Sequence, residues 1–577
     1  MYYRDYIFVI LAVMDSIKSS IQTVIQQLFN INQVVSLSRP DPQFGDYATN
    51  VAMQLSKPLG KNLREIAEQL SEKLRETGNF SEVSVDGPGF INLRVSPSSL
   101  IKTLNGLWGL TYGENNDGAG KTVVVEYPSQ NMAKPYSIGH LRSGNQGWSV
   151  KRLMEVSGWK VITDNHLGDY GAPFGIWVVG FLKYSSDEKL AQGGVYELGR
   201  VYIETKNALK EENSKGETEL ADQVQLWLQK FEKGDQEAIG YSQRFNEISL
   251  GHIHEIMNRL QISTDYELGE TFFAPKGKAL VQDLLKRAIA VQNDDGSVIV
   301  PLNEFGIDVP LLLQKSNGTA LYATTDLATI MYREETWHPD RVIYTVGAEQ
   351  QFHFIQLFAM AKKLGIKTEL IHLWFGMIDQ INDDGTREKM SSRKGVVLME
   401  ELLNQAEDKA REIVKGRDVS DTDIQIIALG AIKFSDFTAD RRTNILFSWD
   451  SIFALSGFSG PYVQYAAVRV NKILGDNQII KTDISSYDYA PEKTLILKLI
   501  DYPDVVRLSA RDFEPHKVAM YLYELARELN RYYESTPVAT GGVTDIQKQA
   551  RLAILQKVSY IFTHGLSLLG IEVPTRM

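Results

Sequence analysis

Residues 122–147 read TVVVEYPSQNMAKPYSIGHLRSGNQG and decide how this part of the chain folds. Their first six residues form an almost continuous apolar run, which is typical of a strand buried inside a parallel sheet. After a loop, residues 136–147 open what we expect to be a helix, with His140 directly after Gly139. A helix start behind a parallel strand presents free N–H groups and a positive dipole end, which bind phosphate. The stretch therefore predicts an α/β unit with a phosphate-binding loop.

Three later stretches extend this pattern. Residues 160–164 (KVITD), 341–347 (RVIYTVG) and 369–376 (ELIHLWFG) read as further strands, and the second runs directly into a helix over 351–361. Strands that alternate with helices predict a doubly wound α/β domain of Rossmann type. A polar span rich in lysine and glutamate, about 181–259, indicates a helical insertion between the two halves of this domain.

The chain before this domain has a different pattern. Apolar residues from Met14 onward recur at helical spacing, and a second amphipathic run covers 63–74. Residues 81–95 alternate like a hairpin with Gly-Pro-Gly at its turn. A loop rich in turn formers, 113–121, then marks a boundary, so we place a small α+β module at 1–115.

From about residue 448 the strand signal ends, and long amphipathic helical patterns such as 518–533 take over. We therefore place the α/β domain at 116–447 and an all-α domain at 448–577. The expected fold class is a multidomain α/β protein: a doubly wound domain with a helical insertion, an N-terminal α+β module and a C-terminal helical bundle.

Composition excludes several kinds of protein. With no cysteine among 577 residues there is no disulfide framework, no thiolate nucleophile and no cysteine-bound zinc. The net charge of -11 argues against a protein that coats polyanions over its whole surface, although a local basic face can still hold RNA. The apolar start, residues 6–14, is shorter than the ~20 residues of a membrane span and lacks a signal cleavage site. We expect a buried segment there, while a start at Met14 stays open.

A second cationic motif, KMSSRKG at 389–395, lies on the far side of the α/β domain. Lysines and serines around a glycine suit a flexible loop that binds pyrophosphate. His140 could likewise donate a hydrogen bond to phosphate oxygens or to the charge that develops on them. Taken singly, a packed histidine and a solvated basic turn are the simpler interpretations. The two motifs together in one domain point to a shared nucleotide site.

This pair resembles the two signatures of class I aminoacyl-tRNA synthetases, His-Ile-Gly-His and Lys-Met-Ser-Lys-Ser. Here the first reads Ser137-Ile-Gly-His140 and the second begins KMSSR at Lys389. Ser137 replaces the first histidine of the family and cannot carry charge. Ser392 stands where the family has its second lysine, with basic residues directly after it. The resemblance implies that His140 and Lys389 are catalytic, with Lys134 as an auxiliary cation.

Other blocks are similar to the arginyl-tRNA synthetase family over nearly the whole chain. They are VVVEYPSQNMAKPYSIGHLRS at 123–143, NHLGDYGAPFG at 165–175, NGTALYATTDLA at 317–328, GAEQQFH at 347–353 and FSGPYVQYAAVR at 458–469. The last block marks that family's anticodon-binding domain, and FGDYATN at 44–50 is similar to its N-terminal module, which is associated with the tRNA elbow. The resemblance implies ATP-dependent activation of L-arginine and transfer to the 3' end of tRNA(Arg).

Arginine recognition can be argued from the residues themselves. A guanidinium offers five N–H donors and no acceptor, so its pocket should present carboxylates and neutral acceptors. Tyr322 and Asp326 are spaced i, i+4 and share one face if their segment is helical, although an ordinary amphipathic helix is the simpler interpretation without the resemblance. We expect Asp326 to face the guanidinium and Tyr322 to pack on the aliphatic stem. Glu126 ends the first strand, at the edge where doubly wound folds bind ligands.

The resemblance completes these sets. It implies that the arginine pocket also contains Glu126, Ser129, Asn131 and Gln350, with Glu126 and Asn131 toward the α-amino group. It implies that ATP is contacted by Ser137, Gly139, His140, Gly168, Asp169, Met377, Lys389, Ser391, Ser392 and Lys394. For tRNA it implies Phe44, Tyr47 and Asn50 of the N-terminal module. The C-terminal helices offer Tyr462, Tyr465, Arg469 and Arg531, because cations interleaved with aromatic rings suit unstacked bases, although a core or half-buried position is the simpler interpretation of each tyrosine alone.

The implied cofactor is Mg²⁺ carried by the phosphates of the substrate ATP, without protein-bound zinc. The implied partners are tRNA(Arg) and L-arginine, and we expect no DNA, no membrane, a monomer and a cytoplasmic location. Two alternatives stay open. One is a small-molecule nucleotidyltransferase with the same histidine signature, which would not need the terminal domains. The other is an inactive RNA-binding or regulatory paralogue, which the Ser137 substitution leaves open.

Overall fold

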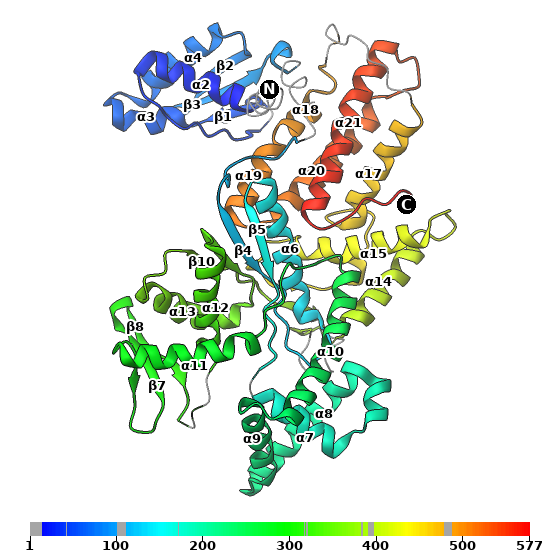
Figure 1. Cartoon of the computed structure of the whole chain (residues 1–577). Coiled ribbons are helices and arrows are strands. Elements are labelled where there is room, and N and C mark those ends of the chain that lie inside the picture. The colour runs from blue at the N-terminus through cyan, green and yellow to red at the C-terminus, as the bar shows by residue number, and fades with distance from the viewer. Residues whose placement is uncertain are drawn as a thin grey trace, which may run out of the picture.

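The computed structural model describes residues 14–577 except 42, 101–110, 171, 317, 319–320, 382–384, 391–396, 478–486 and 488. Figure 1 shows the N-terminal module and the C-terminal helices at one end of the molecule, the parallel sheet in the middle and the helical insertion at the opposite end. Most of the apolar start predicted to be buried, residues 6–13, lies outside the described residues.

The central sheet is parallel, as the apolar runs predict. Its strands follow the order β10-β9-β4-β5, and Val124 pairs with Val342 on one side and Ile162 on the other. Two strands are shorter than predicted, because past Tyr344 and His372 the chain continues as loops. The strands are β4 (Thr122–Glu126), β5 (Lys160–Asp164), β9 (Arg341–Tyr344) and β10 (Glu369–His372).

The crossover helix after β4 is packed unusually close to the sheet. A short 3-10 turn, η1 (Ile138–His140), leads into α6 (Leu141–Val156). A Cβ atom on Gly147 would lie 2.5 Å from side-chain carbons of Tyr127. A larger residue would force the helix away from the sheet, so the glycine sets the height at which His140 stands above the strand ends.

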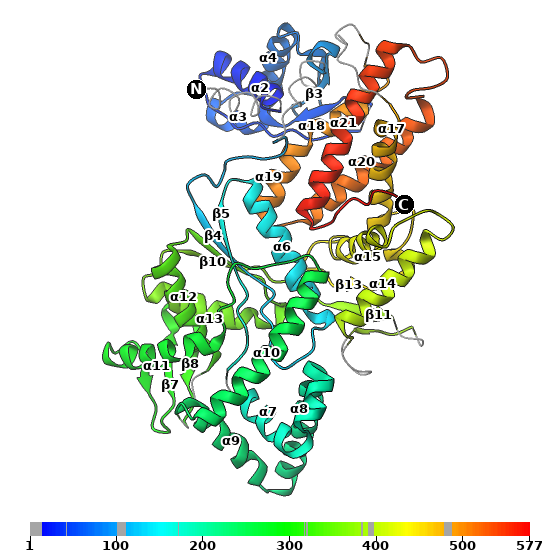
Figure 2. The ribbon, with the colours of Figure 1, turned by 45° about the vertical axis from the view of Figure 1, so that its right-hand side comes forward.

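The predicted insertion is helical, and it begins before residue 181. In Figure 2 its helices form a separate lobe below the sheet. They are α7 (Ala172–Tyr184), α8 (Asp187–Lys215), α9 (Glu219–Glu232) and α10 (Gln236–Arg259). This lobe reaches the first signature, because His252 Nε2 accepts the Tyr136 N–H at 3.2 Å and Ser249 Oγ accepts the Ala133 N–H at 2.9 Å.

A second, antiparallel sheet in the α/β domain was not predicted. It has the order β6-β7-β8 and packs near α11 to α13 at the edge of the domain. Its elements and neighbours are α11 (Glu270–Lys286), β6 (Val291–Gln292), β7 (Val298–Leu302), η2 (Asn303–Phe305), β8 (Ile307–Gln314), α12 (Tyr322–Trp337), η3 (Ala348–Gln350) and α13 (Gln351–Lys363).

Lys389 lies at the end of a strand instead of in a loop after one. It closes β12, which pairs antiparallel with β11, and Met390 N–H donates to the Ile378 carbonyl at 2.9 Å. The elements of this part are β11 (Ile378–Ile381), β12 (Arg387–Lys389), α14 (Met399–Ile413), α15 (Asp421–Asp436) and β13 (Ile445–Leu446).

The terminal domains have the predicted character. The module combines α2 (Met14–Phe29), β1 (Tyr47–Thr49), α3 (Val51–Leu59), α4 (Leu63–Glu76), β2 (Phe80–Asp86) and β3 (Phe90–Val95). The C-terminal bundle contains α16 (Trp449–Ile452), α17 (Gly460–Gly475), α18 (Lys493–Ile500), α19 (Tyr502–Asp512), α20 (His516–Ser535) and α21 (Asp545–Leu568). Within the described ranges, none of the helices has both the length and the apolarity needed to cross a bilayer.

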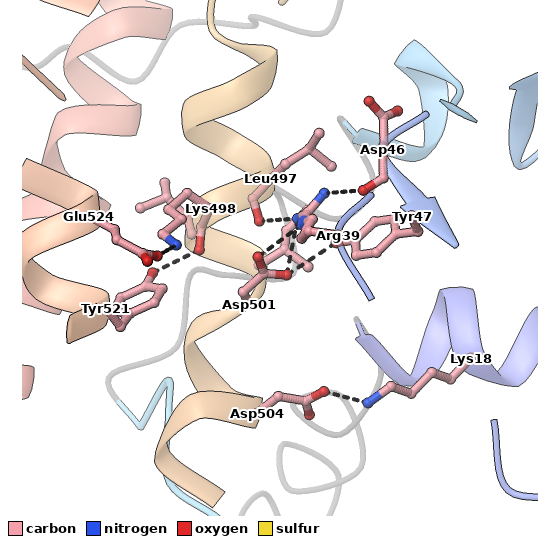
Figure 3. Close-up of polar contacts among 12 residues, drawn as sticks. Lys18, Arg39, Asp46, Tyr47, Leu497, Lys498, Asp501, Asp504, Tyr521 and Glu524 are labelled. Atoms are coloured by element: carbon pink, nitrogen blue, oxygen red, sulfur yellow. Dashed lines mark hydrogen bonds and ion pairs between the residues drawn. The ribbon is translucent and has the colours of Figure 1, made fainter. Parts of the chain in front are cut away.

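The module and the bundle meet at what we call the module junction, the contact of residues 14–95 with α18 and α19. Figure 3 shows Arg39 pointing from the module toward Asp501, with both carboxylate oxygens accepting from it at 3.0 Å. Lys493 pairs with Asp46 at 2.7 Å, and Lys18 pairs with Asp504. Three ion pairs thus join the module to the bundle, beside a hydrophobic cluster that contains residues of both.

Candidate active site

A cavity of about 500 Å³ opens at the carboxyl ends of β4 and β9, where doubly wound folds bind ligands. Its volume lies within the range of small-molecule sites. It is lined by the loop after β4, the start of α6, the loop after β9 and the end of β12. The predicted site residues that it brings together are Ser129, Asn131, Gly139, His140, Gln350, Met377 and Lys389.

The imidazole of His140 is oriented by Ser137. The Ser137 N–H donates to His140 Nδ1 at 3.3 Å, and the Ser137 hydroxyl lies at the same distance. Because Nδ1 accepts, the neutral ring carries its proton on Nε2. Ser137 therefore keeps a structural role in the signature although it replaces a histidine of the family pattern.

Burial and the nearby ammonium of Lys134 lower the pKa of His140 to about 4. The ring is therefore neutral at neutral pH and can donate one hydrogen bond from Nε2 without a buried charge. Its edge-on contact with Tyr136, at 5.3 Å between ring centroids, holds the ring plane.

Lys389 lines the same cavity as His140. Its Nζ lies 3.3 Å from Glu349 Oε1, and both side chains are about half exposed. The chain after it returns to the first signature, where Ile138 N–H donates to the Val397 carbonyl at 3.0 Å. The two signatures are thus joined through the backbone. Ser391, Ser392 and Lys394 lie outside the described residues.

Among the described residues predicted to be catalytic or to contact ATP, Lys134, Ser137, Gly168 and Asp169 do not line this cavity. Lys134 lies 5.3 Å above the ring of Tyr202 in the insertion, where burial and Lys206 lower its pKa. Gly168 accepts from the Met132 N–H in the loop after β4. Asp169 accepts from the Thr271 N–H at 2.8 Å, so its carboxylate faces the start of α11.

Glu126 is buried and already paired. Its Oε2 lies 2.7 Å from Arg333 Nη1, and its Oε1 accepts from the Ser129 hydroxyl at 3.4 Å. Arg333 is fully buried and also pairs with Asp164 at 2.6 Å, so it ties α12 to two strand ends. This arrangement fixes Ser129 at the cavity wall and leaves Glu126 less free to bind an α-amino group than its position in the sequence indicates.

Tyr322 and Asp326 share one face of α12, as their spacing predicts. Tyr322 is 57% exposed. Asp326 Oδ2 lies 2.6 Å from His353 Nε2, and Oδ1 lies 3.7 Å from His166 Nε2. A carboxylate, two imidazoles and an accessible phenol therefore form a second polar cluster, which we call the α12 pocket.

Glu270, at the start of α11, belongs to the same surroundings and was missed from the sequence. Burial, then the nearby carboxylates of Asp326 and Asp169, raise the pKa of Glu270 to about 9. An acidic residue at the start of a helix is usually interpreted as a stabilising partner of the helix dipole. Nothing in the local sequence indicates that this one is buried beside two other acids.

Two other missed residues hold the cavity in shape. Arg142, fully buried, donates to Asp436 at 2.7 Å and to the Gly376 carbonyl at 2.8 Å. The hydroxyl of Ser143 donates to the Thr345 carbonyl at 2.7 Å. Both residues lie within residues 122–147. The sequence could have indicated Arg142, because it occupies a position that the apolar pattern of α6 places on the buried face, where an arginine is rare unless it is paired.

The residues predicted to contact tRNA divide by exposure. Phe44, Asn50, Tyr465, Arg469 and Arg531 are exposed. Tyr462 is half-buried, with its hydroxyl accepting from Asn530.

Tyr47 requires a correction, because it is 1% exposed and its hydroxyl accepts from Arg39. Its ring is enclosed at the module junction, so it supports the module and does not present a surface to RNA.

The described residues also contain three potential metal ligands close together, Asp440, Glu514 and His516. Arg442 already pairs with both carboxylates, at 2.5 and 2.9 Å. In the nucleotide cavity, among the lining residues that the structure describes, Glu349 supplies the carboxylate and pairs with Lys389.

Comparison with known proteins identifies the class. The family described as "tRNA synthetases class I (R), catalytic domain" matches residues 109–449, which contain both signatures. The "Arginyl tRNA synthetase N terminal domain" matches 15–95, and the "DALR anticodon binding domain" matches 463–577. With the parallel sheet and the shared cavity, these matches define a class I aminoacyl-tRNA synthetase.

Similar proteins narrow the class. An arginine–tRNA ligase of Fusobacterium nucleatum is 32% identical over 92% of this chain and 94% of the relative, and one of Colwellia psychrerythraea is 33% identical over 95% and 96%. The arginyl-tRNA synthetase of Thermus thermophilus has the same fold, with a TM-score of 0.81 and 23% identity over 97% of this chain and 99% of that one. The chain belongs to the arginyl-tRNA synthetase family and has its ligase function.

Proposed function

We propose that the chain activates L-arginine with ATP in the cavity between His140 and Lys389, and transfers the arginyl group to tRNA(Arg). The observation that carries this proposal is that both signature residues line one cavity at the strand ends. The α12 pocket is linked to it by the chain, since His353, which bonds Asp326, lies three residues after Gln350 of the cavity wall. This pocket supplies the acceptors that a guanidinium requires.

In the first step, the arginine carboxylate attacks the α-phosphorus of ATP. A bond from the carboxylate oxygen to phosphorus forms, the bond to the β-phosphate oxygen breaks, and pyrophosphate leaves. Gly139 lets the phosphates approach the backbone, and His140 Nε2–H and the Lys389 ammonium neutralise the charge that develops. The phosphate oxygens of ATP would hold Mg²⁺, which would neutralise part of their charge.

In the second step, a hydroxyl of the terminal tRNA ribose attacks the arginyl-adenylate carbonyl, and AMP leaves. The chain contributes position and charge and forms no covalent bond with the substrate. Exposed Phe44 and Asn50 on the module and Tyr465, Arg469 and Arg531 on the bundle are our candidate tRNA contacts.

For arginine, we assign the guanidinium to the α12 pocket, with Asp326 and Glu270 as acids and Tyr322 against the stem. Ser129, Asn131 and Gln350 line the nucleotide cavity and are assigned to the backbone end of the substrate. Glu126 acts there by orienting Ser129 and Arg333.

The remaining assignments rest on the family pattern. We keep the domain boundaries near residues 115 and 447. We also propose that the protein is a monomer in the cytoplasm, which suits an enzyme of translation. The terminal domains argue against the small-molecule nucleotidyltransferase, since such an enzyme needs neither.

Arginine-dependent exchange of pyrophosphate into ATP, measured with and without tRNA, tests the proposal. Removing one group that stabilises the transition-state charge costs about 100- to 1,000-fold in rate, so Lys389→Ala and His140→Asn should each lose that much. Lys215→Ala, at the end of α8 and 55% exposed, is the control and should change the rate by less than about twofold. An inactive paralogue would show no exchange in the unaltered chain.

A further inference from the structure

His166, in the loop after β5, has an imidazole nitrogen that is buried without a hydrogen bond. Its Nδ1 lies 3.0 Å from the Leu268 carbonyl, which can only accept, so Nδ1 carries the proton. The other nitrogen, Nε2, then has a lone pair and no donor among the residues that the structure describes. The side chain is 11% exposed.

The unpartnered nitrogen points at a second acceptor. His166 Nε2 lies 3.7 Å from Asp326 Oδ1. In the neutral ring, neither atom can donate to the other, so the pair is complete only when an N–H group lies against both. A planar group whose N–H donors point outward side by side can donate to two such neighbouring acceptors, and the guanidinium is that group.

The orientation of Asp326 is fixed from the other side. Its Oδ2 lies 2.6 Å from His353 Nε2, on the first turn of α13. A hydrogen bond this short to a carboxylate holds the side chain firmly. It also uses one lone pair of Oδ2 and turns Oδ1 toward His166.

We infer that His166 is a specificity-determining residue that accepts a guanidinium N–H of the substrate beside Asp326, and that His353 is a positioning residue for Asp326. The inference rests on the proposed function, since it places arginine in the α12 pocket. It adds a neutral acceptor to the acids.

A role in the fold alone does not account for this geometry. The ring of His166 packs 5.6 Å from Phe273, and its Nδ1–H bonds the Leu268 carbonyl. Both contacts would hold the loop without Nε2. A buried acceptor that lacks a donor costs free energy, so it is retained where a ligand supplies the donor.

The test is arginine-dependent pyrophosphate exchange in the presence of tRNA, with separate titrations of arginine and ATP. His166→Phe keeps a ring against Phe273 and removes the acceptor. We expect its KM for arginine to rise about 10- to 100-fold, the loss of one hydrogen bond to a charged group. The KM for ATP and kcat should change by less than about threefold, because the lost contact is made equally in the ground and transition states.

Glutamine variants show whether the hydrogen-bonding atom or the shape of the ring determines arginine binding. His166→Gln retains an acceptor oxygen, so its KM for arginine should stay within about fivefold of the unaltered chain. His353→Phe should raise the KM for arginine about tenfold, and His353→Gln, which retains a donor, should recover most of that loss.

Some results would overturn the inference. If the KM of His166→Phe for arginine is within about twofold of that of the unaltered chain, His166 does not accept a hydrogen bond from the substrate. If that variant melts below the assay temperature, His166→Met replaces it, with arginine binding measured by calorimetry and the same expected loss. Asp326→Asn separates failure of the His166 role from failure of the proposed arginine site. If this variant also leaves the KM for arginine unchanged, the α12 pocket does not bind the guanidinium.

Discussion

Asp501 holds a guanidinium of this chain, whereas Asp326 is the carboxylate that we propose for the guanidinium of the substrate, and their surroundings differ. At the module junction, Asp501 holds Arg39 through both oxygens, while the Tyr47 ring lies 3.9 Å from the guanidinium carbon. The Arg39 nitrogens also donate to the Tyr47 hydroxyl and to the carbonyls of Asp46 and Leu497. Every nitrogen of this guanidinium therefore has an acceptor.

The α12 pocket has the same components, a carboxylate and a nearby tyrosine, but different neighbours. Asp326 faces the imidazoles of His353 and His166 instead of an arginine. Burial and the two neighbouring acids raise the pKa of Glu270 to about 9, so that carboxyl is protonated at neutral pH.

The difference follows from whether the guanidinium belongs to the chain. Arg39 is always present, so its acceptors can be permanently charged and paired. A substrate pocket must be stable without its ligand, and bare buried carboxylates would be costly. A neutral imidazole offers an acceptor nitrogen, and the protonated carboxyl of Glu270 can release its proton when the guanidinium arrives.

The strongest test of this comparison is Asp326→Asn. Loss of the charge that faces the guanidinium should raise the KM for arginine about 100- to 1,000-fold, while the KM for ATP changes little. Arginine titrations of pyrophosphate exchange measure this. Glu335→Gln, an exposed acid on the same helix, is the matched control and should have no effect on either KM.

The raised pKa of Glu270 predicts a dependence of arginine binding on pH. Because the free pocket holds a proton up to about pH 9 and a guanidinium favours the ionised carboxyl, binding releases that proton. Affinity for arginine should then rise with pH, by at most about tenfold per unit between pH 6.5 and 8.5.

Calorimetric titrations at several pH values measure the slope. Glu270→Gln cannot ionise but keeps an acceptor, so its affinity should be nearly independent of pH over this interval. An unchanged slope in the variant would assign the proton to another group.

Much of the fold was predictable because it depends on local patterns. The apolar run of β4, the period of α6 and the turn of the β2–β3 hairpin are all visible in short windows. The β6–β8 sheet was missed because its strands contain Pro301 and Pro310, which argue against central strands.

The site was predictable where residues form motifs and not where contacts join distant segments. His140 and Lys389 lie in recognisable stretches. The burial of Tyr47 depends on Arg39 and Asp501, which are 462 positions apart. Likewise, the partners of Asp326 come from the loop after β5 and from α13, so no spacing in the sequence reveals them.

At the module junction, Asp501→Asn should lower the free energy of unfolding by about 1.5–3 kcal/mol, the value of a partly buried hydrogen-bonded charge. Urea titrations measure it. The matched control is Glu68→Gln, which breaks an ion pair with Arg64 that is more than half exposed on both sides and should cost less than about 1 kcal/mol. The KM for arginine should be unchanged in both, which separates a structural guanidinium site from a substrate pocket.

The smallest expected effect is that of Tyr47→Phe. The ring and its stacking on Arg39 are kept, and the loss of one hydroxyl acceptor should cost about 1 kcal/mol of unfolding free energy. Because Tyr47 and Asp501 both contact Arg39, and the Tyr47 hydroxyl also donates to Asp501 at 3.4 Å, the double variant should be less destabilised than the sum of the single variants by more than about 0.5 kcal/mol. Additive effects would mean that the two groups hold Arg39 independently and that their own hydrogen bond contributes little. In that case only the carboxylates of the module junction and the α12 pocket could be compared, because Tyr47 would not act together with Asp501 in binding the guanidinium.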